Sequence, residues 1–418
     1  MTAENWQLAP YNRWAFWHVS EVLPTRQIAR GAGPVRVLPK SNGDGPELSS
    51  IAVTRADGSV STAEKILADT FTDAYLILQD GATVAEWYGH EGGPGRPHAL
   101  MSVSKSMVGC VAAALGDRGL LDIERPVTDH VPQLAGSGYV GATIRHLLDM
   151  RSGVRFREDY LDQDAEVQQL AKAIGWSTGE TGGVRGIYPY LTTLSAEVLH
   201  GTRFLYRSAE TDVLGWVCEQ AAGKPMSELI STLIWQPMGA EFDAQIMSDV
   251  TGTAVHDGGI CAAVRDVGRF GQLLLDNGSV PHGQSGSRAV IGSRWFRHAW
   301  AVDAEARRLF DASPAEASMP GGWYRNQFWL MPGAHGTVLL CLGIYGQLVY
   351  VSRRTRTVFV KVSSWPQPQV PEYLHDTLRM CDAVSGALAG RQAADGTHHL
   401  PGVIAGLSRH GRTPRSGL

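Results

Sequence analysis

The stretch Met101-Ser102-Val103-Ser104-Lys105-Ser106-Met107 lies where a polar segment passes into the apolar run 107–115. The run is rich in helix-forming residues and predicts a buried helix that begins close to Ser102. Side chains three positions apart on a helix are neighbours, so we expect the Lys105 amine beside the Ser102 hydroxyl. A neutral amine there, at the positively polarised start of a helix, would make the serine a nucleophile.

The same spacing has a simpler interpretation. Ser102 would then be a helix N-cap, and Lys105 a solvated side chain one turn later. The apolar, small-residue surroundings of Lys105 favour the nucleophile over the cap. We therefore expect Lys105 to be neutral in the resting site and to act as the base for Ser102.

A second candidate element is Phe204-Leu205-Tyr206-Arg207-Ser208, about a hundred residues further along the chain, where a loop leads into a predicted helix. A tyrosine oxygen can shuttle a proton if a nearby lysine ammonium lowers its pKa. The alternative is a core tyrosine beside a serine that caps the helix. The position of Tyr206 downstream of a Ser-x-x-Lys motif favours the proton shuttle.

Composition narrows the class of protein. The chain has 418 residues and a formal net charge of −4, so it offers no basic surface for nucleic acid. Its five cysteines lie far apart, a pattern typical of reduced, buried thiols in a cytoplasmic protein. No Cys-x-x-Cys or His-Glu-x-x-His pattern indicates a metal site, and we expect no cofactor. The sequence has no signal-peptide pattern and no apolar run of about 18 residues, so we expect no membrane partner.

Strand patterns lie towards both ends of the sequence and helical patterns between them. A hairpin is predicted around Asp80-Gly81, with strands over 74–78 and 83–88. Two more adjacent strands are predicted over 336–351 and 357–362. The predicted helices cover 144–150, 208–221, 226–234 and 371–390.

These patterns predict an α/β fold of the mixed α+β kind, with an antiparallel sheet flanked by helices. Residues 1–130 and 255–390 would form the lobe that holds the sheet and the helix of Ser102. Residues 131–254 would form an inserted, mostly helical lobe. Residues 391–418, rich in glycine, arginine and histidine, would be a C-terminal tail.

Together these motifs resemble the penicillin-recognising serine hydrolases, a family of class C β-lactamases, DD-peptidases and esterases. Within it, the chain is most similar to the 6-aminohexanoate-dimer (nylon oligomer) hydrolases and related carboxylesterases. The resemblance covers about residues 10 to 390 and implies a β-lactamase-like fold. The similar stretches include Asn12-Arg13-Trp14-Ala15-Phe16, Glu158-Asp159-Tyr160, Leu191-Thr192-Thr193-Leu194, Thr211-Asp212-Val213-Leu214, Gly343-Ile344 with Gly346-Gln347, and Ser363-Ser364-Trp365-Pro366.

The resemblance also implies roles for single residues. Ser102 matches the acylated nucleophile, Lys105 its base partner, and Tyr206 the proton shuttle. The backbone N–H groups of Ser102 and Ile344 match the oxyanion hole.

Around this centre, the resemblance implies a substrate pocket but leaves its specificity open. Tyr160 matches a tyrosine on a loop that closes over the substrate, and Trp329 matches an aromatic wall. Ala171 stands where the family has an aspartate that recognises the substrate amino group. Asp257 replaces an asparagine, and Tyr345 replaces the histidine of His-Gly-Gln. The departures at Ala171, Asp257 and Tyr345 put the substrate's identity in doubt, whereas the catalytic trio is complete.

We therefore expect a cytoplasmic serine hydrolase that acts through an acyl-enzyme on short-chain carboxylic esters. Linear amides such as 6-aminohexanoate oligomers are further candidate substrates. Two alternatives stay open: an acyltransferase that passes the acyl group to an alcohol or amine, and a non-catalytic β-lactamase-like binding protein. The expected partner is a small ester or amide, and a homodimer is left open.

Overall fold

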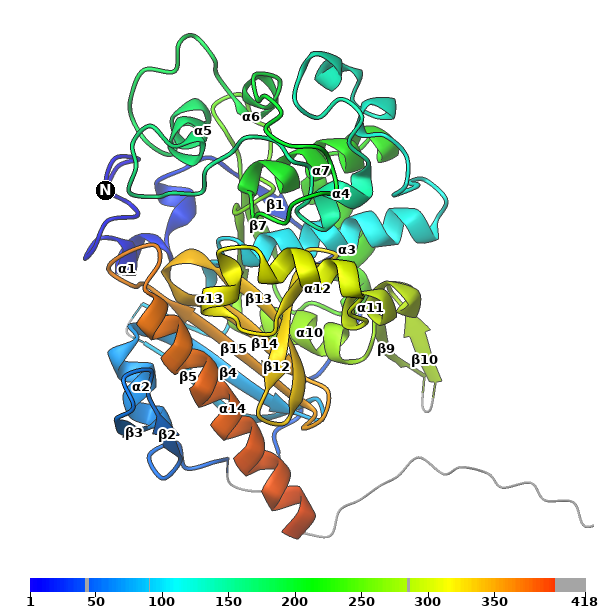
Figure 1. Ribbon diagram of the computed structural model, residues 1–418. Helices are drawn as coiled ribbons and strands as arrows, with labels where there is room; N and C mark the ends of the chain where they lie inside the picture. The colour runs from blue at the N-terminus through cyan, green and yellow to red at the C-terminus, as the bar shows by residue number, and fades with distance from the viewer. Residues whose placement is uncertain (42–44, 90, 284–285, 395–418) are drawn as a thin grey trace, which may run out of the picture.

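The central feature of the fold is an antiparallel sheet of seven strands in the order β11-β12-β13-β14-β15-β4-β5 (Figure 1). This computed structural model describes residues 1–41, 45–89, 91–283 and 286–394. The strands are β4 (Thr72–Gln79), β5 (Ala82–Tyr88), β11 (Trp323–Arg325), β12 (Phe328–Gly333), β13 (Gly336–Gly343), β14 (Gln347–Ser352) and β15 (Thr357–Ser363).

The sheet is covered on both faces, because side chains along its inner strands point alternately to either side. In β15, Val358 and Val360 belong to one apolar cluster, and Phe359 between them belongs to another. The first cluster includes residues of α10 (Val264–Leu275), and the second includes residues of α14 (Pro371–Ala394). The predicted antiparallel sheet flanked by helices is therefore present.

The other helices lie mainly between the early and late strands of the sequence, as predicted. Figure 1 draws α3, α4, α5, α6 and α7 above the sheet. They are α1 (Asn12–Ala15), α2 (Ala63–Asp69), α3 (Val103–Asp117), α4 (Ile144–Leu148), α5 (Glu166–Ile174), α6 (Ile187–Leu191), α7 (Ser208–Ala222), α8 (Met226–Ile230), α9 (Gln236–Met238), α11 (Ser293–Trp300), α12 (Ala304–Asp311) and α13 (Ala315–Ser318).

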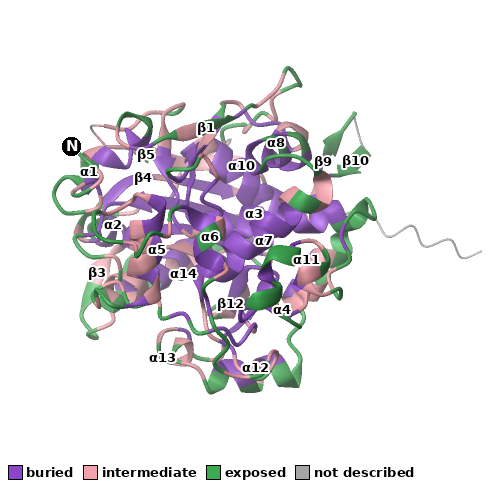
Figure 2. Ribbon diagram, turned by 90° about the horizontal axis from the view of Figure 1, so that it is seen from above, coloured by how far each residue is buried: buried purple, intermediate pink, exposed green. Residues whose placement is uncertain are grey.

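Helix α3 is the most deeply buried of these elements, and every residue from Val103 to Leu115 is shielded from solvent. Figure 2 shows it beside α7 in the middle of the molecule. Alanine, glycine and serine side chains on α3 allow its neighbours to approach closely on all sides. The apolar run after Ser102 thus forms a central helix, which confirms the prediction for 107–115.

A second, smaller sheet was not predicted. It has the order β1-β7-β8-β6, and its strands are three or four residues long. The strands are β1 (Thr25–Ile28), β6 (Pro97–Ala99), β7 (Ala244–Met247) and β8 (Ile260–Ala263). Strands this short contain too few alternating apolar and polar residues to be recognised from sequence. β7 lies within 131–254 yet pairs with strands of the other predicted lobe, and the division into lobes stays a prediction.

The prediction of one strand over 336–351 is wrong. The chain turns back on itself at Ile344–Gly346, so that β13 and β14 pair as antiparallel neighbours. Tyr345 has a φ of 63° and Gly346 a φ of 89°, both in the left-handed region that ends a strand. The apolar pattern runs on through this turn, which is why it gave no strand boundary.

Several local predictions are confirmed. Asp80 and Gly81 both have positive φ and join β4 to β5, as expected of a tight hairpin turn. The five cysteines are free and buried. α14 begins at the predicted residue and extends to Ala394, so only the first four residues of the predicted tail 391–418 are described. No helix in the described ranges is long and apolar enough to cross a membrane.

Two glycines of α3, Gly109 and Gly116, offer a direct test of how closely this helix packs against its neighbours. A Cβ added at Gly109 would lie 2.9 Å from the Asn326 carbonyl oxygen and 2.9 Å from the Gln327 Cβ. We expect Gly109→Ala to lower the free energy of unfolding by about 1–3 kcal/mol, because the core there has no room. A Cβ added at Gly116 would have its nearest neighbour, the Leu121 carbonyl oxygen, 3.5 Å away. Gly116→Ala is therefore expected to raise the free energy of unfolding by up to about 1 kcal/mol, because alanine has the higher helix propensity. Urea denaturation of both variants measures the difference, and a shift of the same sign in both would contradict the packing described.

Candidate active site

Ser102 and Lys105 are in contact at the start of α3. The Lys105 Nζ donates to the Ser102 Oγ at 2.8 Å, to the Ser208 Oγ at 3.1 Å and to the Asp257 carbonyl oxygen at 2.8 Å. Ser102 makes no side-chain capping bond to α3, and the Lys105 side chain is only 1% exposed. The alternative of a helix cap beside a solvated lysine is therefore excluded.

The surroundings of Lys105 favour its ammonium form over the neutral amine expected from the sequence. Burial by itself lowers the pKa of Lys105, but surrounding acidic groups outweigh it and raise the pKa above its ordinary value. All three N–H bonds of the ammonium have an acceptor, which agrees with the charged form. The acidic groups are, in order of effect, Tyr206, Asp257, Glu158 and Asp212.

A chain of hydrogen bonds leads away from Lys105 to a carboxylate. The Ser208 hydroxyl accepts from Lys105 and donates to the Glu158 Oε1 at 2.6 Å, and the Ser208 N–H donates to the Oε2 at 3.0 Å. The Tyr160 hydroxyl donates to the same Oε1 at 2.7 Å. Glu158 thus links Lys105 to the loop that carries Tyr160. No role for Glu158 could be predicted from the sequence, where its place two residues before Tyr160 in a stretch similar to the family is the only signal.

Asp257 is held in place from a neighbouring helix. Its carboxylate lies 3.6 Å from the Lys105 Nζ, and its carbonyl group accepts from the same atom. The Asp212 Oδ1 on α7 accepts the backbone N–H groups of His256 and Asp257 at 3.1 and 3.2 Å. This pair of bonds fixes the turn that presents Asp257 to Lys105.

Tyr206 lies on the other side of Lys105. The Lys105 Nζ is 5.2 Å from the centre of the Tyr206 ring. Burial raises the pKa of Tyr206 above its ordinary value, although the charge of Lys105 and hydrogen bonding to Ser102 act in the opposite direction. The Trp329 ring stacks on Tyr206 with centroids 5.0 Å apart. Trp329 is thus a wall beside the candidate proton shuttle.

A buried ion pair anchors the segment that carries Tyr206 and Ser208. Between them in sequence, Arg207 donates to the Glu210 Oε1 at 2.7 Å, and both side chains are fully buried. Ser152 also donates to this carboxylate oxygen at 2.7 Å. Loss of one partner from such a pair leaves an uncompensated charge, so the segment has little freedom to move.

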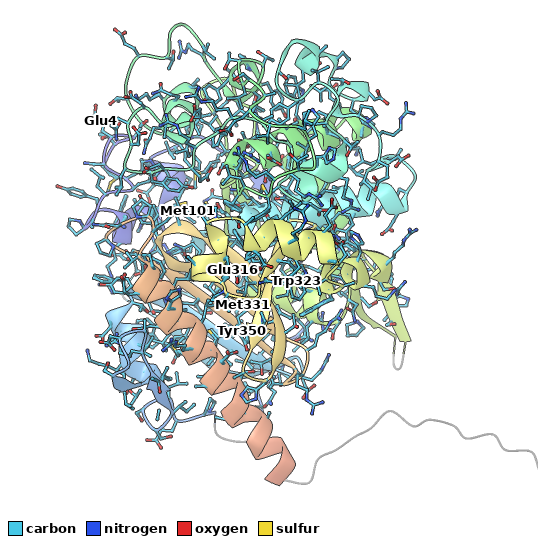
Figure 3. All side chains as sticks on the ribbon, in the orientation of Figure 1. Glu4, Met101, Glu316, Trp323, Met331 and Tyr350 are labelled. Atoms are coloured by element: carbon cyan, nitrogen blue, oxygen red, sulfur yellow. The ribbon has the colours of Figure 1, made fainter. Side chains whose placement is uncertain are left out.

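The two candidate oxyanion residues each adjoin a backbone residue in the left-handed region. Met101, directly before Ser102, has a φ of 46°, and Tyr345, directly after Ile344, has a φ of 63°. Non-glycine residues seldom adopt such angles outside turns and functional sites. A Cβ at Gly343 would lie 2.6 Å from the Leu100 carbonyl oxygen, so glycine allows the two segments to approach. Figure 3 labels Met101 where the sheet meets the helices.

Ser102 and Ile344 stand on the border between two cavities. One, of about 300 Å³, is lined by Tyr206 and Trp329 among others; we call it the apolar chamber. The other, of about 460 Å³, we call the second cavity. It holds the three residues at which the chain departs from the family, Ala171, Asp257 and Tyr345. Tyr160 lines both cavities, and each predicted site residue except Lys105, which contacts Ser102 from behind, lines one or both of them.

Within the described ranges, no group of three or more histidine, cysteine, aspartate or glutamate side chains could hold a metal ion.

Ala171 belongs to α5 and gives the second cavity a methyl group where a carboxylate was implied by resemblance. The Tyr345 ring packs edge-on against Phe16 at 5.3 Å, and its hydroxyl lies 3.4 Å from the Gln7 Oε1. Tyr345 therefore ties the N-terminal segment to the site.

Comparison with known proteins identifies the family. The sequence model described as Beta-lactamase matches residues 63–381, which is more than half of the chain. A 6-aminohexanoate-dimer hydrolase of Paenarthrobacter ureafaciens is 36% identical over 390 residues, covering 92% of this chain and 95% of that protein. Esterase EstB of Burkholderia gladioli is 30% identical over 168 residues, covering 38% of this chain and 41% of that protein.

Solved structures agree in fold. A Bacillus anthracis protein that carries the provisional name 6-aminohexanoate-dimer hydrolase superposes with a TM-score of 0.81 at 24% identity, covering 94% of this chain and 97% of that one. At this identity the likeness supports the fold alone, and it confirms the predicted β-lactamase-like architecture. From the match to the family model and the long similarity to a named hydrolase, we conclude that the chain belongs to the Beta-lactamase family and is a serine hydrolase.

Proposed function

We propose that the protein cleaves short-chain carboxylic esters, and linear amides more slowly, by passing their acyl group to Ser102. The observation that carries this proposal is the 2.8 Å contact between the Lys105 Nζ and the Ser102 Oγ at the border of two cavities. A nucleophile at such a border can attack a carbonyl group whose two substituents lie on either side. The named activities of the hydrolase and esterase relatives support this reaction class.

Because Lys105 is charged at rest, a proton has to leave it before it can act as a base. The hydrogen bonds offer a route, in which the Lys105 ammonium gives a proton to Ser208 while Ser208 gives its own to the Glu158 carboxylate. Neutral Lys105 then takes the Ser102 proton as the Oγ bonds to the substrate carbonyl carbon. The coupled groups would titrate together, so an apparent pKa would belong to the cluster.

The tetrahedral intermediate carries a negative oxygen, which the N–H groups of Ser102 and Ile344 would bind. In other hydrolases one such donor lowers the barrier by about 2.7–4 kcal/mol. Tyr206 would pass a proton to the leaving oxygen or nitrogen as its bond to the carbonyl carbon breaks, and it would be reprotonated from Lys105. Water then attacks the acyl-enzyme, and the carboxylic acid departs with Ser102 regenerated.

The first prediction concerns the nucleophile. Wild-type protein mixed with an excess of a serine-directed alkyl phosphonate is expected to gain the mass of one adduct, measured by intact mass spectrometry. Ser102→Ala should remain unmodified and lose esterase activity by more than about 10⁴-fold. Ser106→Ala, which removes a buried hydroxyl from the same helix, is the matched control and should still react. An adduct that persists in Ser102→Ala would refute the assignment.

The second prediction concerns pH. The Asp257 carboxylate stabilises the Lys105 ammonium and raises its pKa. In Asp257→Asn this pKa falls, so neutral Lys105 becomes available at lower pH. We expect the acidic limb of the pH profile of kcat/KM to move towards lower pH. Glu4→Gln removes the same charge from an exposed residue of the second cavity and should leave the limb in place. A shift towards higher pH in Asp257→Asn would contradict the proposed role of Lys105.

The third prediction concerns the departure at Ala171. A carboxylate placed there would face the second cavity and could pair with a substrate ammonium. We expect Ala171→Asp to raise the ratio of kcat/KM for ethyl 6-aminohexanoate to kcat/KM for uncharged ethyl heptanoate by roughly fivefold. This is the effect of an ion pair between the new carboxylate and the substrate ammonium that contributes about 1 kcal/mol. Ala171→Asn is the uncharged control and should leave the ratio unchanged. An unaltered ratio in Ala171→Asp would mean that the substrate's acyl chain does not reach α5.

A further inference from the structure

The apolar chamber is built from side chains of distant segments. Phe204 and Tyr206 precede α7, Trp329 and Leu348 come from β12 and β14, and Leu374 comes from α14. Phe204, Trp329 and Leu348 are at least nine-tenths buried. Phe204 and Trp329 meet edge-to-face with centroids 6.0 Å apart, which continues the aromatic wall that begins at Tyr206. The chamber thus offers a substrate a mainly hydrocarbon surface.

The described residues that line the chamber include no cation. Among the described residues that line it, Glu158 is the one with an ionisable carboxyl or amino side chain, and no lysine, arginine or histidine is present. Both Glu158 oxygens already accept hydrogen bonds from Ser208 or Tyr160. A carboxylate brought into the chamber would lose hydration without gaining a cationic partner among these residues. The lining therefore favours a substrate group that carries no negative charge.

The position of Tyr206 indicates whether the leaving half or the acyl half of the substrate enters the apolar chamber. A general acid has to lie within hydrogen-bond reach of the leaving atom. Tyr206 lines the apolar chamber, whereas Ser208 and Asp257 line the second cavity. With Ser102 and Ile344 on the border, a carbonyl carbon held there has its leaving oxygen on the Tyr206 side. Its acyl chain then lies on the Asp257 side.

We propose that the substrates are esters of apolar alcohols, whose alkyl or aryl alcohol half occupies the apolar chamber while the acyl half occupies the second cavity. This assignment rests on the proposed acyl transfer to Ser102 and deepens it. It also separates this chain from hydrolysis of the 6-aminohexanoate dimer, because the leaving half of that amide ends in a carboxylate. Among the described residues, the chamber's lining has no cation with which such a carboxylate could pair.

Two ester series test the assignment. In the first, the acyl group is acetyl and the alcohol grows from ethanol through butanol to hexanol. In the second, the alcohol is ethanol and the acyl group grows from acetyl through butanoyl to hexanoyl. We expect kcat/KM to rise by up to about threefold to fourfold for each methylene buried in the first series. In the second series the rise per methylene should be smaller, because amide and carboxylate groups share the second cavity.

Variants in each cavity make the test reciprocal. Ala315→Phe, on α13, and Leu374→Trp, on α14, would fill the apolar chamber and should abolish the rise in kcat/KM with alcohol length, so that hexyl acetate loses more activity than ethyl acetate. Ala171→Leu should alter the acyl series alone. Two chamber variants are used so that one that fails to fold does not remove the test.

The outcomes separate this assignment from the proposed function. If Ser102 reacts with the phosphonate and cleaves ethyl acetate, but alcohol length has no effect or the chamber variants alter the acyl series instead, the assignment of the two halves is overturned. If no ester is cleaved and Ser102 does not react, the proposed function itself fails. A rise with alcohol length that disappears in a folded chamber variant supports the assignment.

Discussion

The buried Lys105 ammonium is the constraint around which this site is built. A charged amine in an apolar helix is unfavourable unless acceptors and negative groups surround it. The chain supplies them from three places: Ser208 at the start of α7, the Asp257 turn before β8, and Glu158 on the loop before α5. Each of these groups is fixed by a further bond, so the packing of α3 against its neighbours and the protonation state of the site depend on each other.

This constraint explains why the contact between Ser102 and Lys105 could be predicted from sequence, although the direction of the Lys105 pKa shift could not. The spacing of Ser102 and Lys105 is local, and helix geometry alone brings the two side chains together. The pKa of Lys105 depends on Asp257, Glu158 and Asp212, which lie 152, 53 and 107 positions from it in sequence. No local pattern indicates that these carboxylates meet at one amine. The neutral lysine expected from the Ser-x-x-Lys spacing takes no account of these distant carboxylates.

The same division applies to the fold. The hairpin at Asp80-Gly81 and the long helices follow from turn residues and hydrophobic periodicity, and they were predicted correctly. The turn at Tyr345 was not predicted, because an apolar pattern continues through it and only its backbone angles are unusual. The sheet formed by β1, β7, β8 and β6 was missed because its strands are short and pair across long separations. The residues that line the two cavities could not be predicted either, because each cavity is lined by segments that are far apart in the sequence.

In the proposed reaction, the Ser102 Oγ is the atom that takes the acyl group from the ester and passes it to water. The most direct measurement is to mix the protein with an acetate ester, quench in acid within milliseconds to seconds, and map the acetylated peptide by mass spectrometry. The account predicts acetyl on Ser102, formed and lost at rates consistent with turnover. Acetyl on another residue at those rates, or turnover with no acetylated peptide at any time under conditions that preserve an acyl-serine, would contradict it.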